Sequence, residues 1–193
     1  MKDAFQSKDI QKMLHIPKQR VEYLSLKVPI RPDVAEVEGT GRAHLYSFKN
    51  ALEFAIAQEA SNLGFYITEV RSLLNNLDSW ARSELSNDFD LFAQLKSSYE
   101  FIYPLLETDR HKAVEAMRGY FSTASTVNLY ALLSKQRLDK IGEEVDTSAY
   151  SHAWLPVTDG QILMPFVQGT YGTIILNLAA IKQRVILYAT EGK

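Results

Sequence analysis

A tight break between two short helical stretches near the N-terminus constrains this chain more than any other feature. Ser7 is a good N-cap for the first stretch. That stretch places its apolar residues on one helical face: Ile10, Met13 and Leu14. His15-Ile16-Pro17 then ends the helix, and Pro17 fits the first turn of a new helix, where an N–H would have no partner.

The second helix is predicted over residues 18 to about 26, with Val21 and Leu24 buried. Its outward residues are polar, and two of the four are basic: Lys18, Gln19, Arg20 and Glu22. Two such helices form a helix-turn-helix, a motif that can read the DNA major groove. The alternative is a pair of surface helices that only pack on a core.

Composition limits the class of protein. The 193 residues allow one or two domains, and a hydrophobic content of 46% is ordinary for a packed chain. The absence of cysteine excludes disulfides, thiolate metal sites and a cysteine nucleophile. We find no signal peptide and no apolar run of membrane-spanning length, so a soluble, cytoplasmic protein is expected.

The net charge of −2 hides a local basic excess. Between residues 8 and 31 there are six basic and two acidic residues, and Arg42 and Lys49 follow. A local basic face is enough to meet phosphates, whatever the total charge.

The next segment predicts a wing. After a stiff connector at residues 27–32, two short strands between residues 34 and 46 flank a glycine-rich tip that carries Arg42. Ser47 then caps a helix to about Leu63, which ends at Gly64, and Thr68 caps one more helix.

These elements, in this order, resemble the DNA-binding domain of the MerR family of transcription regulators. The family pattern has a "Gly-Leu-Leu-x-Pro" connector, a wing that ends in "Arg-x-Tyr", and "Leu-Gly-Phe-Ser/Thr-Leu-x-Glu-Ile-Arg-x-Leu-Leu". Here the chain reads Val28-Pro29-Ile30-Arg31-Pro32, Arg42-Ala43-His44-Leu45-Tyr46 and Leu63-Gly64-Phe65-Tyr66-Ile67-Thr68-Glu69-Val70-Arg71-Ser72-Leu73-Leu74. The resemblance covers residues 6–77.

The resemblance implies specific DNA contacts. On the recognition helix they are Lys18, Gln19, Arg20 and Tyr23, and on the wing they are Arg42 and His44. The family usually carries an Arg-Tyr-Tyr/Trp-Glu run where this chain has Glu22-Tyr23-Leu24-Ser25. Glu22 would repel phosphate, or accept a hydrogen bond from a cytosine amino group.

The remaining residues, 79–193, are expected to form a second domain for dimerisation or effector binding. Helices are predicted over 85–106, from 108 or 109 to 121, and over 127–145; the aromatic stripe of the first is typical of a core or dimer seam. Strands are predicted over 150–157, 161–167 and 173–178, followed by a helix from 179 to about 188. The fold class is therefore α+β, mainly α: a winged helix-turn-helix at residues 1–78, a helical segment, and a small antiparallel sheet with a C-terminal helix.

No sequence signal indicates an enzyme. The four histidines are scattered, and phosphate-loop, dinucleotide and serine-hydrolase motifs are absent, so no catalytic residues, cofactor or metal are expected. A sensor without cysteine would bind an organic effector in an aromatic pocket. Candidate pocket residues are Tyr99, Tyr150, Trp154 and Phe166, which would serve equally well as core.

The sequence thus predicts a DNA-binding transcription regulator that acts as a homodimer on an inverted-repeat site of double-stranded DNA. A small organic effector is a candidate second partner. The alternative is a protein-interaction adaptor or anti-regulator that keeps the winged-helix scaffold without DNA binding; Glu22 and the overall charge favour this alternative.

Overall fold

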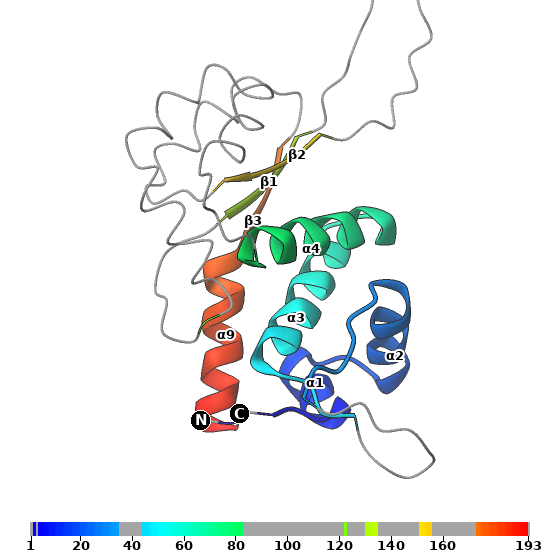
Figure 1. Cartoon of the computed structure of the whole chain (residues 1–193), viewed down its shortest axis with the longest axis vertical. Helices are drawn as coiled ribbons and strands as arrows, with labels where there is room; N and C mark the ends of the chain where they lie inside the picture. Colours follow the sequence, from blue (N-terminus) through cyan, green and yellow to red (C-terminus); the bar gives the residue numbers. More distant parts are fainter. Residues whose placement is uncertain are drawn as a thin grey trace, which may run out of the picture.

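The structure is a computed structural model that describes residues 2, 4–34, 44–82, 122, 130–134, 151–155 and 173–192. The described part is mainly helical, as predicted (Figure 1). The helices are α1 (Ser7–Leu14), α2 (Lys18–Lys27), α3 (Phe48–Asn62), α4 (Ile67–Arg82) and α9 (Leu178–Glu191). The strands are β1 (Tyr130–Ser134), β2 (Ser151–Leu155) and β3 (Thr173–Asn177).

The turn between α1 and α2 lies at His15–Pro17, where the sequence predicted it. His15 adopts the left-handed conformation with φ 53°, and the Ile16 N–H donates to the Gln11 carbonyl at 3.1 Å. The start of α1 differs from the prediction, because Gln6 is the N-cap and Ser7 is the first helical residue. The reason is local: the Gln6 N–H donates to the Asp9 carboxylate at 2.7 Å, which fixes the cap one residue earlier.

Helices α3 and α4 form a second helical pair. The Ser47 hydroxyl caps α3 by accepting from the Asn50 N–H, and Gly64, with φ 90°, ends it, both as predicted. The prediction that Thr68 caps α4 is wrong, because the helix already begins at Ile67. The Tyr66 N–H donates to the Glu69 carboxylate at 2.7 Å, so the helix is capped from within its first turn.

One hydrophobic core joins these helices. Phe5, Ile10, Leu24, Phe54 and Leu73 are all fully or almost fully buried in it. A short antiparallel bridge between Phe5 and Tyr46 closes the core, with a 2.8 Å N–H to carbonyl hydrogen bond in each direction. The Tyr46 ring then meets the Phe54 ring edge to face at 5.2 Å.

The C-terminal helix α9 belongs to this same core. Its residues Ile181, Val185 and Tyr188 are buried, as predicted, and α9 lies beside α3 in Figure 1. An ion pair joins Arg184 to Glu59 of α3 at 2.6 Å. The helix predicted at the far end of the second domain thus packs on residues of the first, and α4 continues through the predicted boundary at 78/79. The division into two domains stays a prediction.

The N-terminus is tied to the end of α9. The Lys2 N–H donates to the Ala189 carbonyl at 2.8 Å, and the Lys2 ammonium lies 2.7 Å from the Asp9 carboxylate. Burial raises the pKa of Asp9, but the Lys2 and Gln6 hydrogen bonds and the charges of Lys2 and Lys8 outweigh it, so that pKa lies below its usual value. The start of the chain and the end of α9 therefore meet at one corner of the fold, where Figure 1 marks both termini.

The three strands form an antiparallel sheet in the order β2-β1-β3, with Leu132 paired to Ala153 on one side and Ile175 on the other. β2 and β3 lie within stretches predicted as strands. The prediction of a helix over 127–145 is wrong at residues 130–134, which form the central strand. The spacing of apolar residues in so short a run is compatible with either a strand or a helix. Here residues 130–134 form a strand because their backbone pairs with β2 on one edge and β3 on the other.

Several predictions lie outside the described residues. They are the helices over 85–106 and 108–121, the strand over 161–167, and most of the wing (residues 35–43). None of the helices in the described ranges is both long and apolar enough to span a membrane.

Candidate nucleic-acid interface

The predicted contact residues of α2 lie on two flanks of that helix and on the ridge between them. Val21 and Leu24 face the core, so helical geometry turns the opposite side of α2 to solvent. Gln19 is exposed on that solvent side. Arg20 and Tyr23 lie on the flank nearest α3, and Lys18 lies on the flank nearest His44.

Arg20 is held in place by α3. Its Nε donates to the Gln58 Oε1 at 2.9 Å, and the Gln58 amide in turn donates to Asn62 at 2.7 Å. The Arg20 guanidinium carbon also lies 5.3 Å from the centre of the Tyr23 ring, a cation–π distance. Since Nε is occupied, the terminal nitrogens of the guanidinium are the part of Arg20 available to an anion or a base.

On the other flank, Lys18 and His44 share a groove of about 540 Å³. The groove runs between α2 and the stretch that leads into α3. Its lining is Ser7, Lys18, Val21, Glu22, Ser25, Leu26, His44 and Tyr46. His44 is exposed, and the two rings of His44 and Tyr46 are 6.5 Å apart. The cation of Lys18 and the imidazole of His44 can both donate hydrogen bonds to an anion in this groove.

The ridge, the solvent-facing side of α2, carries Glu22 and also Leu26, a residue that the resemblance did not single out. Glu22 is exposed beside Lys18, with 3.4 Å between the Glu22 carboxylate and the Lys18 ammonium. Leu26 is 76% exposed, and Tyr23, on the flank nearest α3, is 40% exposed. An exposed ion pair of this kind contributes little stability, so both partners can take up other contacts.

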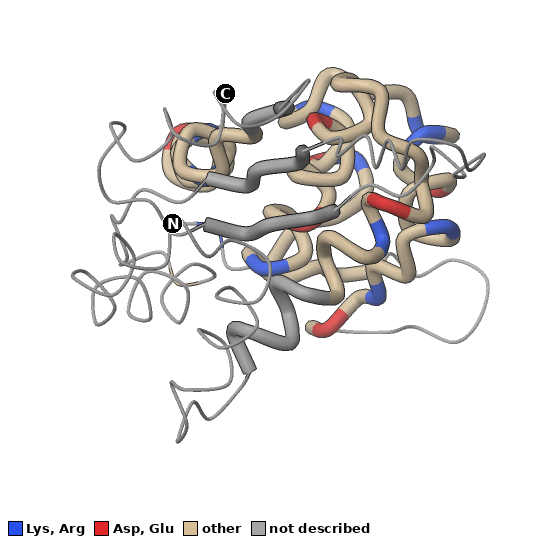
Figure 2. Tube along the Cα trace, turned by 90° about the horizontal axis from the view of Figure 1, so that it is seen from above, with Lys and Arg blue, Asp and Glu red and all other residues tan. Residues whose placement is uncertain are grey.

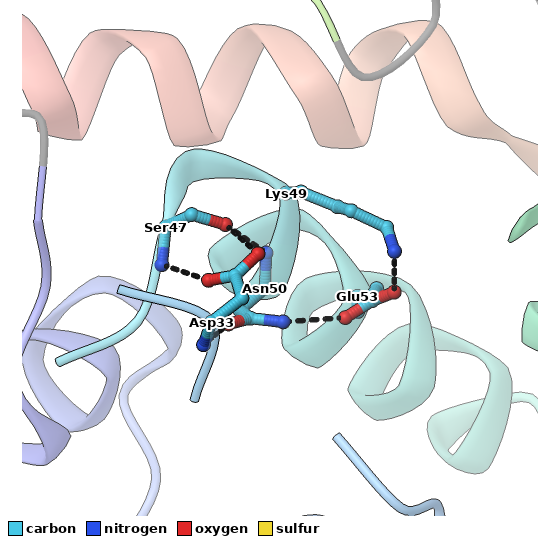
Figure 3. A network of polar contacts seen from close by, with 5 residues as sticks. All are labelled: Asp33, Ser47, Lys49, Asn50 and Glu53. Carbon is cyan, nitrogen blue, oxygen red and sulfur yellow. Dashed lines mark hydrogen bonds and ion pairs between the residues drawn. The ribbon is translucent and has the colours of Figure 1, made fainter. Parts of the chain in front are cut away.

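The base of the predicted wing is anchored by polar contacts. The Val34 N–H donates to the Leu45 carbonyl at 3.3 Å, which brings together the two ends of segment 35–43. The Asp33 carboxylate accepts from the Ser47 N–H at 3.0 Å and from the Ser47 hydroxyl at 2.7 Å (Figure 3). Because Ser47 is the N-cap of α3, the Asp33 charge also lies at the positive end of that helix.

The same network continues into α3. The Asp33 N–H donates to the Asn50 amide oxygen at 3.2 Å, and the Asn50 amide donates to Glu53 at 2.9 Å. The Lys49 ammonium lies 3.4 Å from Glu53, so every residue drawn in Figure 3 is linked to another. Asn50 and Glu53 are both buried, which makes this network a fixed support for the segment that starts at residue 34.

Two positioning residues were missed by the sequence analysis. Gln58 orients Arg20, and Arg71 of α4 donates from its guanidinium to the Lys27 carbonyl, the last residue of α2. A cation there satisfies an open carbonyl and meets the negative end of the helix dipole. Arg71 was part of the quoted family pattern, but that pattern gave it no role; Gln58 had no sequence signal, because it acts across 38 residues.

Charges of both signs are interspersed along the helical part of the chain, as Figure 2 shows. Within α2 itself Lys18, Arg20 and Lys27 outnumber Glu22, which agrees with the local excess predicted from the sequence. Among the residues that the structure describes, no three histidine, aspartate or glutamate side chains are grouped to hold a metal ion.

Of the remaining predicted residues, the structure describes only Trp154. Arg42 lies outside the described residues, as do Tyr99, Tyr150 and Phe166 of the proposed aromatic pocket. Trp154 lies in β2, opposite Ala131 of β1. The aromatic pocket therefore stays a prediction.

Comparison of the sequence with protein-family models and with curated proteins finds no match.

Proposed function

We propose that this protein is a sequence-specific, double-stranded DNA-binding regulator of the MerR-like winged-helix type. The observation that carries the proposal is the way α2 is presented. The left-handed His15 ends α1 just before α2 begins, Gln58 of α3 accepts a hydrogen bond from Arg20, and Arg71 of α4 donates to the carbonyl of Lys27, so α2 is held by contacts at its start, its middle and its end. A short, externally braced second helix after a tight turn is the arrangement that enters a major groove.

The two flanks of α2 suit different parts of a duplex. The groove of Lys18 and His44 lies between α2 and the end of the predicted wing, where a phosphate backbone would pass. On the other flank, Arg20 binds Gln58 through Nε. Its terminal nitrogens do not take part in that hydrogen bond, so they can reach a phosphate or a guanine edge. Arg42, at the tip of the wing in this proposal, adds a further phosphate contact.

The wing is the second component of the proposal. Support comes from its base, where Val34 pairs with Leu45 and Asp33 binds Ser47. A segment of nine residues, 35–43, that leaves and returns at adjacent positions is the length of a short hairpin.

The protein is proposed to act as a homodimer on an inverted repeat. A single α2 covers too few base pairs for useful specificity in a genome, and two-fold symmetric proteins match two-fold symmetric sites. An organic ligand remains a candidate effector.

The direct test is equilibrium binding to fluorescent duplexes of random sequence. We expect binding at 50 mM salt that weakens steeply by 200 mM salt, because neutralised phosphates release their counterions. The matched variant is Lys18→Gln, which removes one cation. It should reduce the slope of log affinity against log salt concentration by about one. Absence of binding at both salt concentrations would contradict the proposal.

A protein-interaction adaptor is the second candidate function. It is favoured by the exposed apolar residues Leu26, Leu63 and Tyr66 and by Glu22 on the ridge of α2. Retention on a random-DNA column separates the two functions, since an adaptor flows through at low salt and a DNA binder is held.

A further inference from the structure

The ridge of α2 carries three side chains that are chemically different and aligned. Gln19, Glu22 and Leu26 follow one another at spacings of three and four residues, so they lie on one line along the helix. All three are exposed. The line is about 10 Å long at ~1.5 Å per residue, which matches about three base pairs at ~3.4 Å each.

Neither Glu22 nor Leu26 is explained by folding. The core of the fold is formed by the opposite side of α2, through Val21 and Leu24. Leu26 is the most exposed large hydrophobic residue in the described part of the chain. The Glu22 carboxylate touches only the flexible end of Lys18 among the contacts of the described residues, and that pair is itself exposed.

We propose that Gln19, Glu22 and Leu26 form a base-reading ridge, in which Glu22 selects cytosine and Leu26 selects thymine. This inference rests on the proposed DNA binding and specifies its target. Glu22 accepts from the cytosine N4 amino group, Leu26 contacts the thymine C5 methyl group, and Gln19 pairs with the adenine N6 and N7 positions. Arg20, held by Gln58, and Lys18 supply cations beside the ridge.

The acid gives the ridge its selectivity. A carboxylate near phosphates loses binding energy at every site, and only a cytosine amino group at the right base pair compensates for that loss. On binding, the Lys18 ammonium can leave Glu22 and pair with a phosphate, so this cation keeps a partner. The Glu22 carboxylate is then free to accept from a base. Glu22 thus works chiefly by rejecting other bases.

The test compares the base preferences of variants selected from one random duplex pool. The wild-type protein should enrich a half-site with adenine, cytosine and thymine within about three consecutive base pairs. Glu22→Gln should replace the C·G preference by A·T at that single position, with a change in discrimination of about tenfold. Lys18→Gln, which removes the partner of the same ion pair, should weaken all sequences alike and leave the base preference unchanged.

Leu26 is tested through the methyl group itself. Uracil in place of the selected thymine should weaken binding of the wild-type protein about fivefold or more, and should leave Leu26→Ala unaffected. Leu63→Ala is the matched control, because Leu63 is another exposed leucine but lies at the end of α3; it should respond to uracil as the wild type does. Unchanged melting temperatures of the variants establish that the fold is intact.

The outcomes separate this inference from the function on which it rests. A selected site whose cytosine and thymine preferences survive in Glu22→Gln and Leu26→Ala would overturn the base-reading ridge and leave DNA binding standing. Failure of the wild-type protein to bind any duplex at low salt would overturn both.

Discussion

Arg20 of α2 donates its Nε hydrogen bond to Gln58 of α3 across 2.9 Å, while its guanidinium lies against the Tyr23 ring. This contact fixes the direction of a long side chain that is otherwise free to rotate. Fixing it in advance reduces the entropy that is lost when the guanidinium binds. The relationship therefore links the packing of α2 on α3 to the chemistry of its exposed flank.

Arg20→Ala should weaken binding to the selected DNA site by ~1–3 kcal/mol, the cost of losing a base-directed guanidinium. Binding is measured on the selected site and on a scrambled duplex of equal length. A loss that is equal on both duplexes would mean that Arg20 contacts only phosphate.

Gln58→Ala tests the positioning role separately. It removes the acceptor of Arg20 but none of the proposed DNA contacts, so we expect a smaller loss, of about 0.5–1.5 kcal/mol. In the Arg20→Ala background the Gln58 substitution should have no further effect on DNA affinity. Additive losses in the double variant would show that Gln58 acts independently of Arg20.

Arg42→Ala should weaken binding to all sequences by a similar factor and reduce the dependence of affinity on salt. The reason is that a wing-tip guanidinium is expected to meet the phosphate backbone, which carries no base identity. Salt titrations on selected and random duplexes give both quantities. A loss confined to the selected site would reassign Arg42 to base recognition.

Asp33→Ala should lower the free energy of unfolding by about 1 kcal/mol, because Asp33 binds the N-cap residue Ser47 and the start of α3. Urea unfolding measures the change. Asp33→Asn is the control, since its amide oxygen can still accept from the Ser47 N–H and should retain part of the stability. Equal stability of all three proteins would exclude this anchor as a support of the fold.

The buried Lys182 of α9 should make the free energy of unfolding depend on pH in the alkaline range. Burial lowers the pKa of its ammonium from 10.5 to about 8. Between these values the unfolded chain binds more protons than the folded one, so stability should rise as the pH is raised through that window. Lys182→Met should lack this part of the rise. Unfolding free energies of the two proteins at pH 8 and pH 10 provide the measurement, and the difference between the proteins removes the contribution of tyrosines; parallel curves would contradict the prediction.

Local signals in the sequence predicted the helical half well. His15-Ile16-Pro17 marks the turn, Ser47 the start of α3 and Gly64 its end, because each acts through neighbouring backbone groups. The two cap errors, at Ser7 and Thr68, have one cause. In each case a carboxylate, Asp9 or Glu69, accepts from the N–H of the residue three positions before it, Gln6 or Tyr66, and the helix begins earlier than predicted.

Contacts distant in sequence could not be predicted in the same way. The pairing of Phe5 with Tyr46, the docking of α9 on α3 and the bond from Arg20 to Gln58 depend on which surfaces meet after folding. The strand β1 was predicted as a helix because its run of apolar residues fits either period, and only its pairing with β2 and β3 decides between them.

The central claim, that a braced α2 reads DNA as part of a dimer, is tested most directly by selection and sequencing of duplexes bound from a random pool at 50 and 200 mM salt. We predict enrichment of an inverted repeat whose half-sites are about one helical turn apart, with less bound DNA at the higher salt. Recovery of the unselected pool composition, or no recovery at either salt, would contradict the claim.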